Sequence, residues 1–105
     1  MLKNTLGLSS PKNVIYCIEN IKTHKKYIGK TRGEYKDRQI NHIKASLSIG
    51  TISHQEIHNA LFGHWDEFAF YIIEEVKDES KLSEREKYYI NFYETDKYGY
   101  NLKVG

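Results

Sequence analysis

The chain has 105 residues, a formal net charge of +2 and 39% hydrophobic residues, which favours one compact domain and excludes a strongly basic, histone-like nucleic-acid binder. No apolar run approaches the roughly 18 residues that span a membrane, and residues 1–13 lack the apolar segment of a signal peptide. Cys17 is the only cysteine, so the sequence excludes an intrachain disulfide and predicts an intracellular, cytoplasmic protein.

The first part of the chain predicts a polar arm and then a β-hairpin. Residues 1–12 are mostly polar and contain a Ser-Ser-Pro break, so we expect an N-terminal arm ahead of a domain at 13–105. Val14–Glu19 alternates its side chains between two faces and predicts a strand that carries Tyr16. After a polar turn, Lys26–Lys30 predicts a second strand, and the short link favours antiparallel pairing.

The rest of the chain alternates helices with one further strand. Tyr35–Ser48 predicts a helix, because Ile40, Ile43 and Leu47 form one apolar stripe. The elements expected after it are a short helix at Ser53–Phe62, a strand at Phe68–Val76, a long helix at Asp78–Tyr93, and a tail at Tyr98–Val104 that could return to the sheet. This order predicts an α+β fold, a small three-stranded and mainly antiparallel sheet flanked by helices in a single domain.

A carboxylate interrupts the apolar stripe of the predicted long helix. Glu86 lies in the middle of the stripe formed by Leu82, Tyr89, Ile90 and Tyr93. A carboxylate facing a core is costly unless something pairs with it, and a divalent ion such as Mg²⁺ would do so. Two plainer alternatives remain open: a capping box with Ser83, or an ion pair with a buried arginine.

Two polar side chains share one face of the predicted helix at Tyr35–Ser48. Arg38 and His42 are spaced i, i+4 and lie away from Ile40, so we expect them to point into a cleft rather than the core. Arginine matches phosphate oxygens with two parallel hydrogen bonds, and histidine moves a proton near neutral pH. The plainer alternative is an ordinary solvated face.

Tyr16 and Tyr27 are the third candidate pair. A phenol with its ordinary pKa near 10 is a poor base in water, and a nearby cation would favour the phenolate. Lys30 is close to Tyr27 in the sequence and could supply that charge. The plainer alternative is that both rings simply pack on the sheet.

Two histidines have a spacing that also occurs in zinc sites. His54 and His58 are spaced i, i+4 on the predicted short helix. Glu56 is displaced from the position that it would hold in an HExxH motif, and no third ligand is evident, so we do not expect zinc.

Taken together, these motifs resemble the GIY-YIG nuclease domain. Val14-Ile15-Tyr16 and Tyr27-Ile28-Gly29 match its two name-giving triplets, with ten residues between them, and Val14 replaces the first glycine. The resemblance covers the chain from about residue 13 onward. Its other matches are an Arg-x-x-x-His pattern at Arg38 and His42, a helix glutamate at Glu86, a lysine after the second triplet at Lys30, and a late asparagine at Asn101.

The resemblance implies a metal-dependent DNA endonuclease of the homing-endonuclease-like, phage or mobile-element branch, with a single active site. It implies that Glu86 binds one divalent cation, Mg²⁺ or Mn²⁺. The roles that it implies for the other residues are general base for Tyr16, positioning of water or phosphate for Tyr27, charge neutralisation for Arg38, proton relay for His42, and a lowered tyrosine pKa or a phosphate contact for Lys30.

Double-stranded DNA is the partner that we expect. Basic side chains around the hairpin could hold its backbone, and the residues assigned to nucleic-acid binding are Lys25, Lys26, Arg32 and Asn101. Little of the chain lies outside the catalytic module, so a homodimer or a partner protein would have to supply sequence specificity. The alternative function is a non-catalytic nucleic-acid-binding module with the same fold, against which the intact catalytic set argues.

Overall fold

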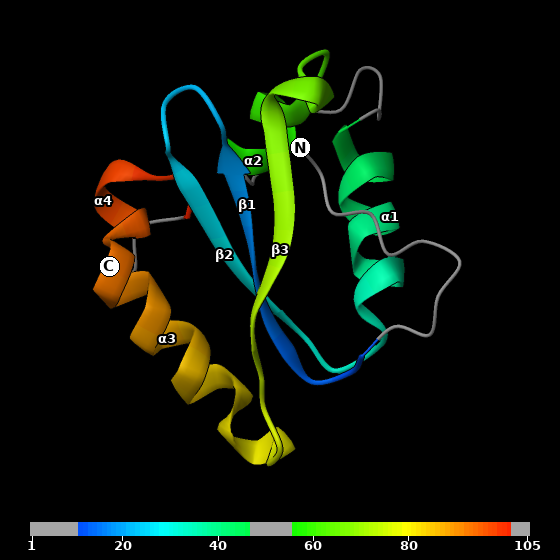
Figure 1. The fold of residues 1–105 in the computed structure, drawn as a ribbon, viewed down its shortest axis with the longest axis vertical. Helices are drawn as coiled ribbons and strands as arrows, with labels where there is room; N and C mark the ends of the chain where they lie inside the picture. Colours follow the sequence, from blue (N-terminus) through cyan, green and yellow to red (C-terminus); the bar gives the residue numbers. More distant parts are fainter. Residues whose placement is uncertain (1–10, 47–55, 102–105) are drawn as a thin grey trace.

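The computed structural model describes residues 11–46 and 56–101, and these residues build one three-stranded antiparallel sheet with helices on both faces. The strands are β1 (Val14–Asn20), β2 (Lys26–Thr31) and β3 (Phe68–Glu75), in the order β2-β1-β3. Figure 1 shows α1 on one side of the sheet and α3 with α4 on the other. The predicted fold class is therefore confirmed, while most of the predicted arm lies outside the described residues.

β1 is the central strand because both of its faces are apolar. Residues 14–18 of this strand are all buried, as expected for a strand that is covered on both sides. The hairpin register pairs Tyr16 with Gly29 and Ile18 with Tyr27. Both tyrosines consequently lie on the same face of the sheet.

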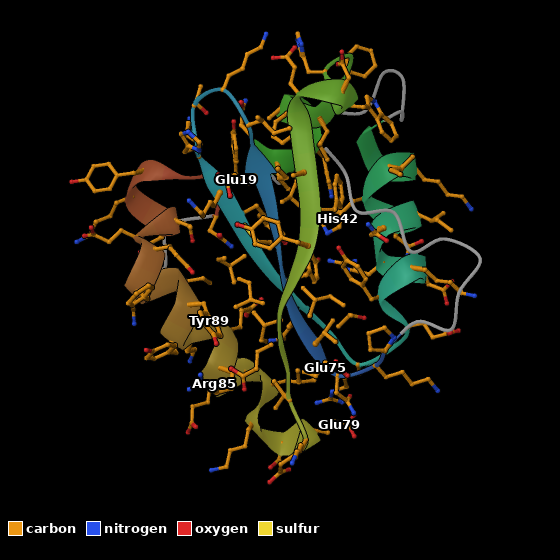
Figure 2. All side chains as sticks on the ribbon, viewed as in Figure 1. Glu19, His42, Glu75, Glu79, Arg85 and Tyr89 are labelled. Carbon is orange, nitrogen blue, oxygen red and sulfur yellow. The ribbon has the colours of Figure 1, made fainter. Side chains whose placement is uncertain are left out.

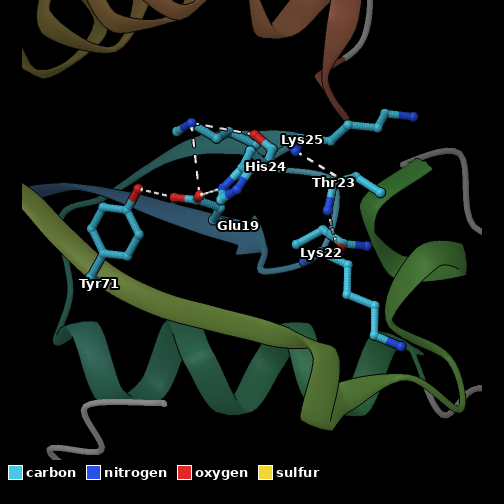
Figure 3. Close-up of polar contacts among 8 residues, drawn as sticks. Glu19, Lys22, Thr23, His24, Lys25 and Tyr71 are labelled. Atoms are coloured by element: carbon cyan, nitrogen blue, oxygen red, sulfur yellow. Dashed lines mark hydrogen bonds and ion pairs between the residues drawn. The ribbon is translucent and has the colours of Figure 1, made fainter.

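Polar side chains define the turn between β1 and β2. The Asn20 side chain accepts hydrogen bonds from the backbone N–H groups of Lys22 and Thr23, at 2.9 and 3.2 Å. The Glu19 carboxylate contacts His24 at 2.9 Å and accepts the Tyr71 hydroxyl at 2.7 Å (Figure 3). These contacts join the turn to β3 and hold the hairpin in register.

The helices divide between the two faces. α1 (Tyr35–Ser46) and α2 (Glu56–Leu61) lie over the face that carries Tyr16, and α3 (Leu82–Tyr93) packs against the opposite face through Leu82, Tyr89 and Ile90. Two short 3-10 helices, Trp65–Glu67 and Glu79–Lys81, precede β3 and α3. None of the described helices has the length and apolar character needed to cross a membrane.

The predicted helix at Asp78–Tyr93 is divided into a 3-10 helix and α3. Asp78 caps the 3-10 helix by accepting a hydrogen bond from the Ser80 backbone, and α3 itself begins at Leu82. Glu94 ends α3 with a left-handed backbone, φ 51° and ψ 41°, which stops helix propagation. The short α4 (Thr95–Tyr98) that follows was not predicted.

The tail returns to the sheet without forming a strand. The backbone N–H of Tyr100 donates to the carbonyl of Lys26 at 2.9 Å. The Asn101 side chain accepts from the Ile28 N–H at 2.8 Å and donates to the Ile28 carbonyl at 2.9 Å. The tail therefore covers the outer edge of β2, and the predicted segment beyond Asn101 lies outside the described residues.

The prediction for the buried face of α1 was wrong. Ile40 and Ile43 are only partly buried, whereas Gln39 and His42 are 6% and 1% exposed. His42 lies in the core because hydrogen bonds satisfy both of its ring nitrogens there, which removes most of the cost of burying them. The polar face of α1 thus packs toward the sheet, and Leu47 lies outside the described residues.

Candidate active site

Gly29 makes room for the phenol of Tyr16. The two residues face each other across the hairpin, and a Cβ at Gly29 would overlap the hydroxyl end of the Tyr16 ring. Tyr27 lies beside it, with ring centroids 6.4 Å apart. Gly29, the glycine of the second triplet, therefore leaves room for the ring of Tyr16, which fills the space that a side chain at position 29 would occupy.

Two side chains of α1 bind the Tyr16 hydroxyl. Arg38 Nε donates to the hydroxyl oxygen at 3.1 Å, and His42 Nε2 lies 2.6 Å from the same oxygen. The His42 ring also meets Tyr27 edge-on, with centroids 5.4 Å apart. Figure 2 shows His42 between α1 and the sheet. We call Tyr16, Tyr27, Arg38 and His42 the phenol site.

A second histidine, His58 of α2, extends the phenol site toward the surface. His42 Nδ1 lies 2.9 Å from Nε2 of His58, and the two rings are 5.0 Å apart. His58 is partly exposed, while His42 is buried. The hydroxyl of Tyr16, the imidazole of His42 and the imidazole of His58 consequently form a hydrogen-bonded row from the core toward the surface.

Burial makes the phenol site electrically neutral except for Arg38. Burial raises the pKa of Tyr16, and the neighbouring Tyr27 adds to the effect, while Arg38 opposes it. Burial also raises the pKa of Tyr27. The pKa of His42 falls to about 3, because burial and then the charges of Arg38 and His58 disfavour the imidazolium. At neutral pH both phenols are therefore protonated and His42 is neutral.

Arg38 keeps its positive charge inside this site. Burial lowers the pKa of the guanidinium, but contacts with Tyr16 and Tyr27 outweigh burial and raise it. A charged, half-buried guanidinium beside two phenols suits the recognition of a phosphate oxygen.

Glu86 lies on α3, on the face of the sheet opposite Tyr16, and contacts Lys30 of β2. Its Oε1 atom lies 3.4 Å from Lys30 Nζ, which also donates to the Ser83 hydroxyl at 2.9 Å. Burial is the main cause of the raised pKa values of Tyr16 and Tyr27, and the charge of Glu86 adds to them. The alternative of a Ser83 capping box was wrong, because α3 begins at Leu82 and Ser83 lies inside the helix rather than at its N-cap.

The donor set at Glu86 fits a magnesium ion that is held mainly by water and substrate. The described residues contain no group of three histidine, cysteine, aspartate or glutamate side chains that could hold a metal. Mg²⁺ commonly uses one or two carboxylates and completes its shell with waters and phosphate oxygens. Glu86 is 22% exposed, so its carboxylate can supply one such ligand.

The residues predicted to bind nucleic acid are dispersed and engaged elsewhere. Lys25 Nζ lies over the ring of Tyr100, and Lys26 Nζ lies 3.9 Å from the Glu19 carboxylate. At the other end of β2, Arg32 Nε contacts Glu79 at 3.3 Å, with both side chains largely exposed. The Asn101 amide is used by the backbone of Ile28, which makes Asn101 a residue that positions β2.

His58 is the site residue that sequence reasoning missed. Its spacing with His54 suggested only zinc, and His54 lies outside the described residues. The sequence pattern that could have indicated it is the position of His58 on the predicted helix, next to Ile57 and three residues before Leu61, both of which are buried. Helical spacing puts His58 at the margin of that packed face.

Comparison with known proteins agrees with this geometry. The family profile described as the GIY-YIG catalytic domain matches residues 12–101. The chain belongs to the GIY-YIG family. The catalytic domain of the homing endonuclease I-TevI is similar in structure, with a TM-score of 0.73, 26% identity, and coverage of 87% of this chain and 98% of that one. This GIY-YIG domain is therefore an enzyme of the nuclease class.

A second solved structure gives the same result. A point mutant of the catalytic domain of the intron endonuclease I-TevI has a TM-score of 0.73 and 25% identity to this GIY-YIG domain, and the match covers 87% of this chain and 93% of the other. No curated protein sequence matches the chain.

Proposed function

We propose that this GIY-YIG domain is a metal-dependent DNA endonuclease that hydrolyses phosphodiester bonds of duplex DNA through one active site. The observation that carries the proposal is the Tyr16 hydroxyl, held by Arg38 at 3.1 Å and by His42 at 2.6 Å within the field of Glu86. Because the similar structures are homing and intron endonuclease domains, a phage or mobile-element origin is part of the proposal.

Tyr16 acts as the general base, with His42 as its proton acceptor. The phenol is protonated, so it can take a proton from the attacking water only by giving its own proton away. His42 is neutral and its Nε2 lies 2.6 Å from the hydroxyl, within the distance at which that proton can transfer. Tyr27, the neighbouring phenol, positions the water or the phosphate.

Arg38 and the ion site stabilise the negative charge of the transition state. The guanidinium of Arg38 donates to the phosphate from a half-buried position, where a fixed charge acts more strongly than in water. Glu86 holds one Mg²⁺ or Mn²⁺ ion, which when bound supplies Lewis-acid stabilisation of the phosphate and the leaving 3′ oxygen. Lys30 can then exchange its contact with Glu86 for a phosphate oxygen.

DNA binding draws on weak and dispersed contacts. Lys25, Lys26 and Arg32 can contact the backbone only by exchanging the partners that they have within the domain. One site cuts one strand at a time, so a double-strand break requires a homodimer, a partner protein or two successive events. Cys17 is buried with a free thiol, which suits the cytoplasmic location that we propose.

A plasmid-nicking assay tests the proposed function. The wild-type domain should convert supercoiled plasmid to nicked product with Mg²⁺ or Mn²⁺, and EDTA should stop the reaction. Arg38→Ala and Glu86→Gln should each lower the rate by at least about 10²-fold, since each removes transition-state stabilisation. Glu84→Gln is the matched control, because Glu84 is exposed on the same helix as Glu86.

The proposal fails if Glu86→Gln or Arg38→Ala cleaves at nearly the wild-type rate. Wild-type protein that binds plasmid but leaves it intact with either metal would favour the non-catalytic binding module. Circular dichroism of each variant establishes that it is folded.

A further inference from the structure

The tautomer of His42 decides in which direction the row formed by Tyr16, His42 and His58 can pass a proton. The oxygen of Tyr16 accepts from Arg38 Nε, so the phenol retains one hydrogen to donate. If that hydrogen goes to His42 Nε2, the neutral imidazole carries its own hydrogen on Nδ1. Nδ1 lies 2.9 Å from His58 Nε2 and then donates to it. With that tautomer of His42, each bond in the row points from the core toward α2.

His42 is poorly suited to keep a proton. It is 1% exposed, and Arg38 is a fixed positive charge on the same helix, one turn away. An imidazolium at His42 is disfavoured by burial and by this charge, which is the reason for its low pKa. His58 is partly exposed, so a proton that reaches it can pass to water.

We propose that His58 is a positioning residue for cleavage that accepts a proton from His42 and releases it to solvent. This inference rests on the proposed function. As the water oxygen bonds to phosphorus, its proton moves to the Tyr16 oxygen, and the Tyr16 proton moves to His42 Nε2. The His42 Nδ1 proton moves to His58 Nε2, while the bond from phosphorus to the 3′ oxygen breaks and that oxygen takes a proton from water. His58 then loses its Nδ1 proton to solvent. His42 and His58 are both neutral again, each with its hydrogen on Nε2, and both hydrogens return to Nδ1 by exchange with solvent before the next cycle.

His58→Gln separates proton transfer from simple orientation. A glutamine can still accept the hydrogen bond from His42 Nδ1 but cannot take up a proton at neutral pH. In single-turnover cleavage with saturating DNA and Mg²⁺, we expect the rate to fall by about 10²-fold while the Kd for DNA is unchanged. The wild-type rate should also decline on the acid side as His58 becomes protonated, and this decline should be absent in the variant.

His64→Gln is the matched control. His64 is an exposed histidine that pairs with Glu67 at 2.8 Å. The His64→Gln variant should cleave at the wild-type rate and with the wild-type pH profile. A wild-type rate and pH profile in His58→Gln would overturn the inference while leaving the proposed function intact. A wild-type domain that never cleaves would instead refute the proposed function.

A measurement on the unaltered domain keeps the inference testable if His58→Gln does not fold. Nitrogen-15 chemical shifts of the histidine side chains report which ring nitrogen carries the hydrogen. We expect neutral His42 with its hydrogen on Nδ1 and neutral His58 with an unprotonated Nε2. A hydrogen on His42 Nε2 would reverse the row and overturn the inference.

Discussion

At the residue scale, burial changes what the side chains of the site can do. Tyr16 is 1% exposed and its pKa is raised, so it cannot serve as a free phenolate. His42 is equally buried and its pKa is lowered, so it is neutral at pH 7 and can hold a proton only in passing. The two shifts are in opposite directions and keep both groups neutral, so the hydroxyl of Tyr16 can donate a hydrogen bond to an unprotonated nitrogen of His42.

Tyr16→Phe should abolish cleavage while keeping the ring in place. Loss of the hydroxyl removes the proposed base and leaves Arg38 Nε and His42 Nε2 without it, at a cost of about 1–3 kcal/mol in the free energy of unfolding. Nicking assays and thermal unfolding measure the two effects. Cleavage by this variant at the wild-type rate would show that Tyr16 is not the base.

Tyr35→Phe is the control for that substitution. Tyr35 packs against Tyr16 with centroids 5.9 Å apart, and its buried hydroxyl has no hydrogen-bond partner among the described residues. Removing this hydroxyl should leave both cleavage and stability close to those of the wild type.

At the element scale, β2 couples the two halves of the site. Gly29 on one face of this strand accommodates the Tyr16 phenol, while Lys30 on the other face binds Glu86 of α3. Asn101 holds the outer edge of the strand through both backbone groups of Ile28. A shift of β2 would therefore move the phenols and the carboxylate relative to each other.

Gly29→Ala should damage activity more than folding. The added Cβ would overlap the end of the Tyr16 ring, which Arg38 and His42 hold by hydrogen bonds, so the ring must move and lose them. We expect a loss of about 1–3 kcal/mol in unfolding free energy and a large loss of cleavage. Urea unfolding and nicking assays measure both.

Gly33→Ala provides the comparison. A Cβ at this exposed glycine would meet only the Thr31 hydroxyl, at 3.9 Å, so this variant should behave like the wild type. Equal activity in Gly29→Ala and Gly33→Ala would mean that the position of the Tyr16 ring does not matter for cleavage.

At the scale of the whole molecule, the buried site links stability to pH. A histidine that is neutral in the folded protein but has its ordinary pKa of 6.5 when unfolded stabilises the fold above that pH. Between pH 6.5 and about 3 the unfolded chain binds more protons than the folded domain, so acid favours unfolding. His58, whose pKa is also lowered by burial, acts in the same direction.

The free energy of unfolding should therefore fall as the pH drops from 6.5. Where the unfolded chain binds one proton at His42 and the folded domain binds none, the free energy of unfolding falls by about 1.4 kcal/mol per pH unit. His42→Gln should show a shallower decline between pH 6.5 and 4.5, above the range where carboxylates such as Glu19, with lowered pKa values, are protonated. Equal slopes for the two proteins, measured by urea titration, would contradict the neutral state of His42.

The sequence alone determined the order of the three strands and the main helices and the α+β class. Alternation and helical spacing are local patterns, so they identify Val14–Glu19 as a strand, which the structure extends to Asn20. The triplets around Tyr16 and Tyr27 also carried the family resemblance that the profile over residues 12–101 bears out.

Only the tertiary structure decided which polar groups are buried and what they contact. The contacts of Tyr16 with His42, of His42 with His58, and of Asn101 with Ile28 join residues 26, 16 and 73 positions apart. Spacing rules place apolar residues in the core, but a polar side chain is buried wherever a distant partner satisfies it. Such a partner exists only once the chain has folded, which is why the polar face of α1 and the role of His58 could not be predicted.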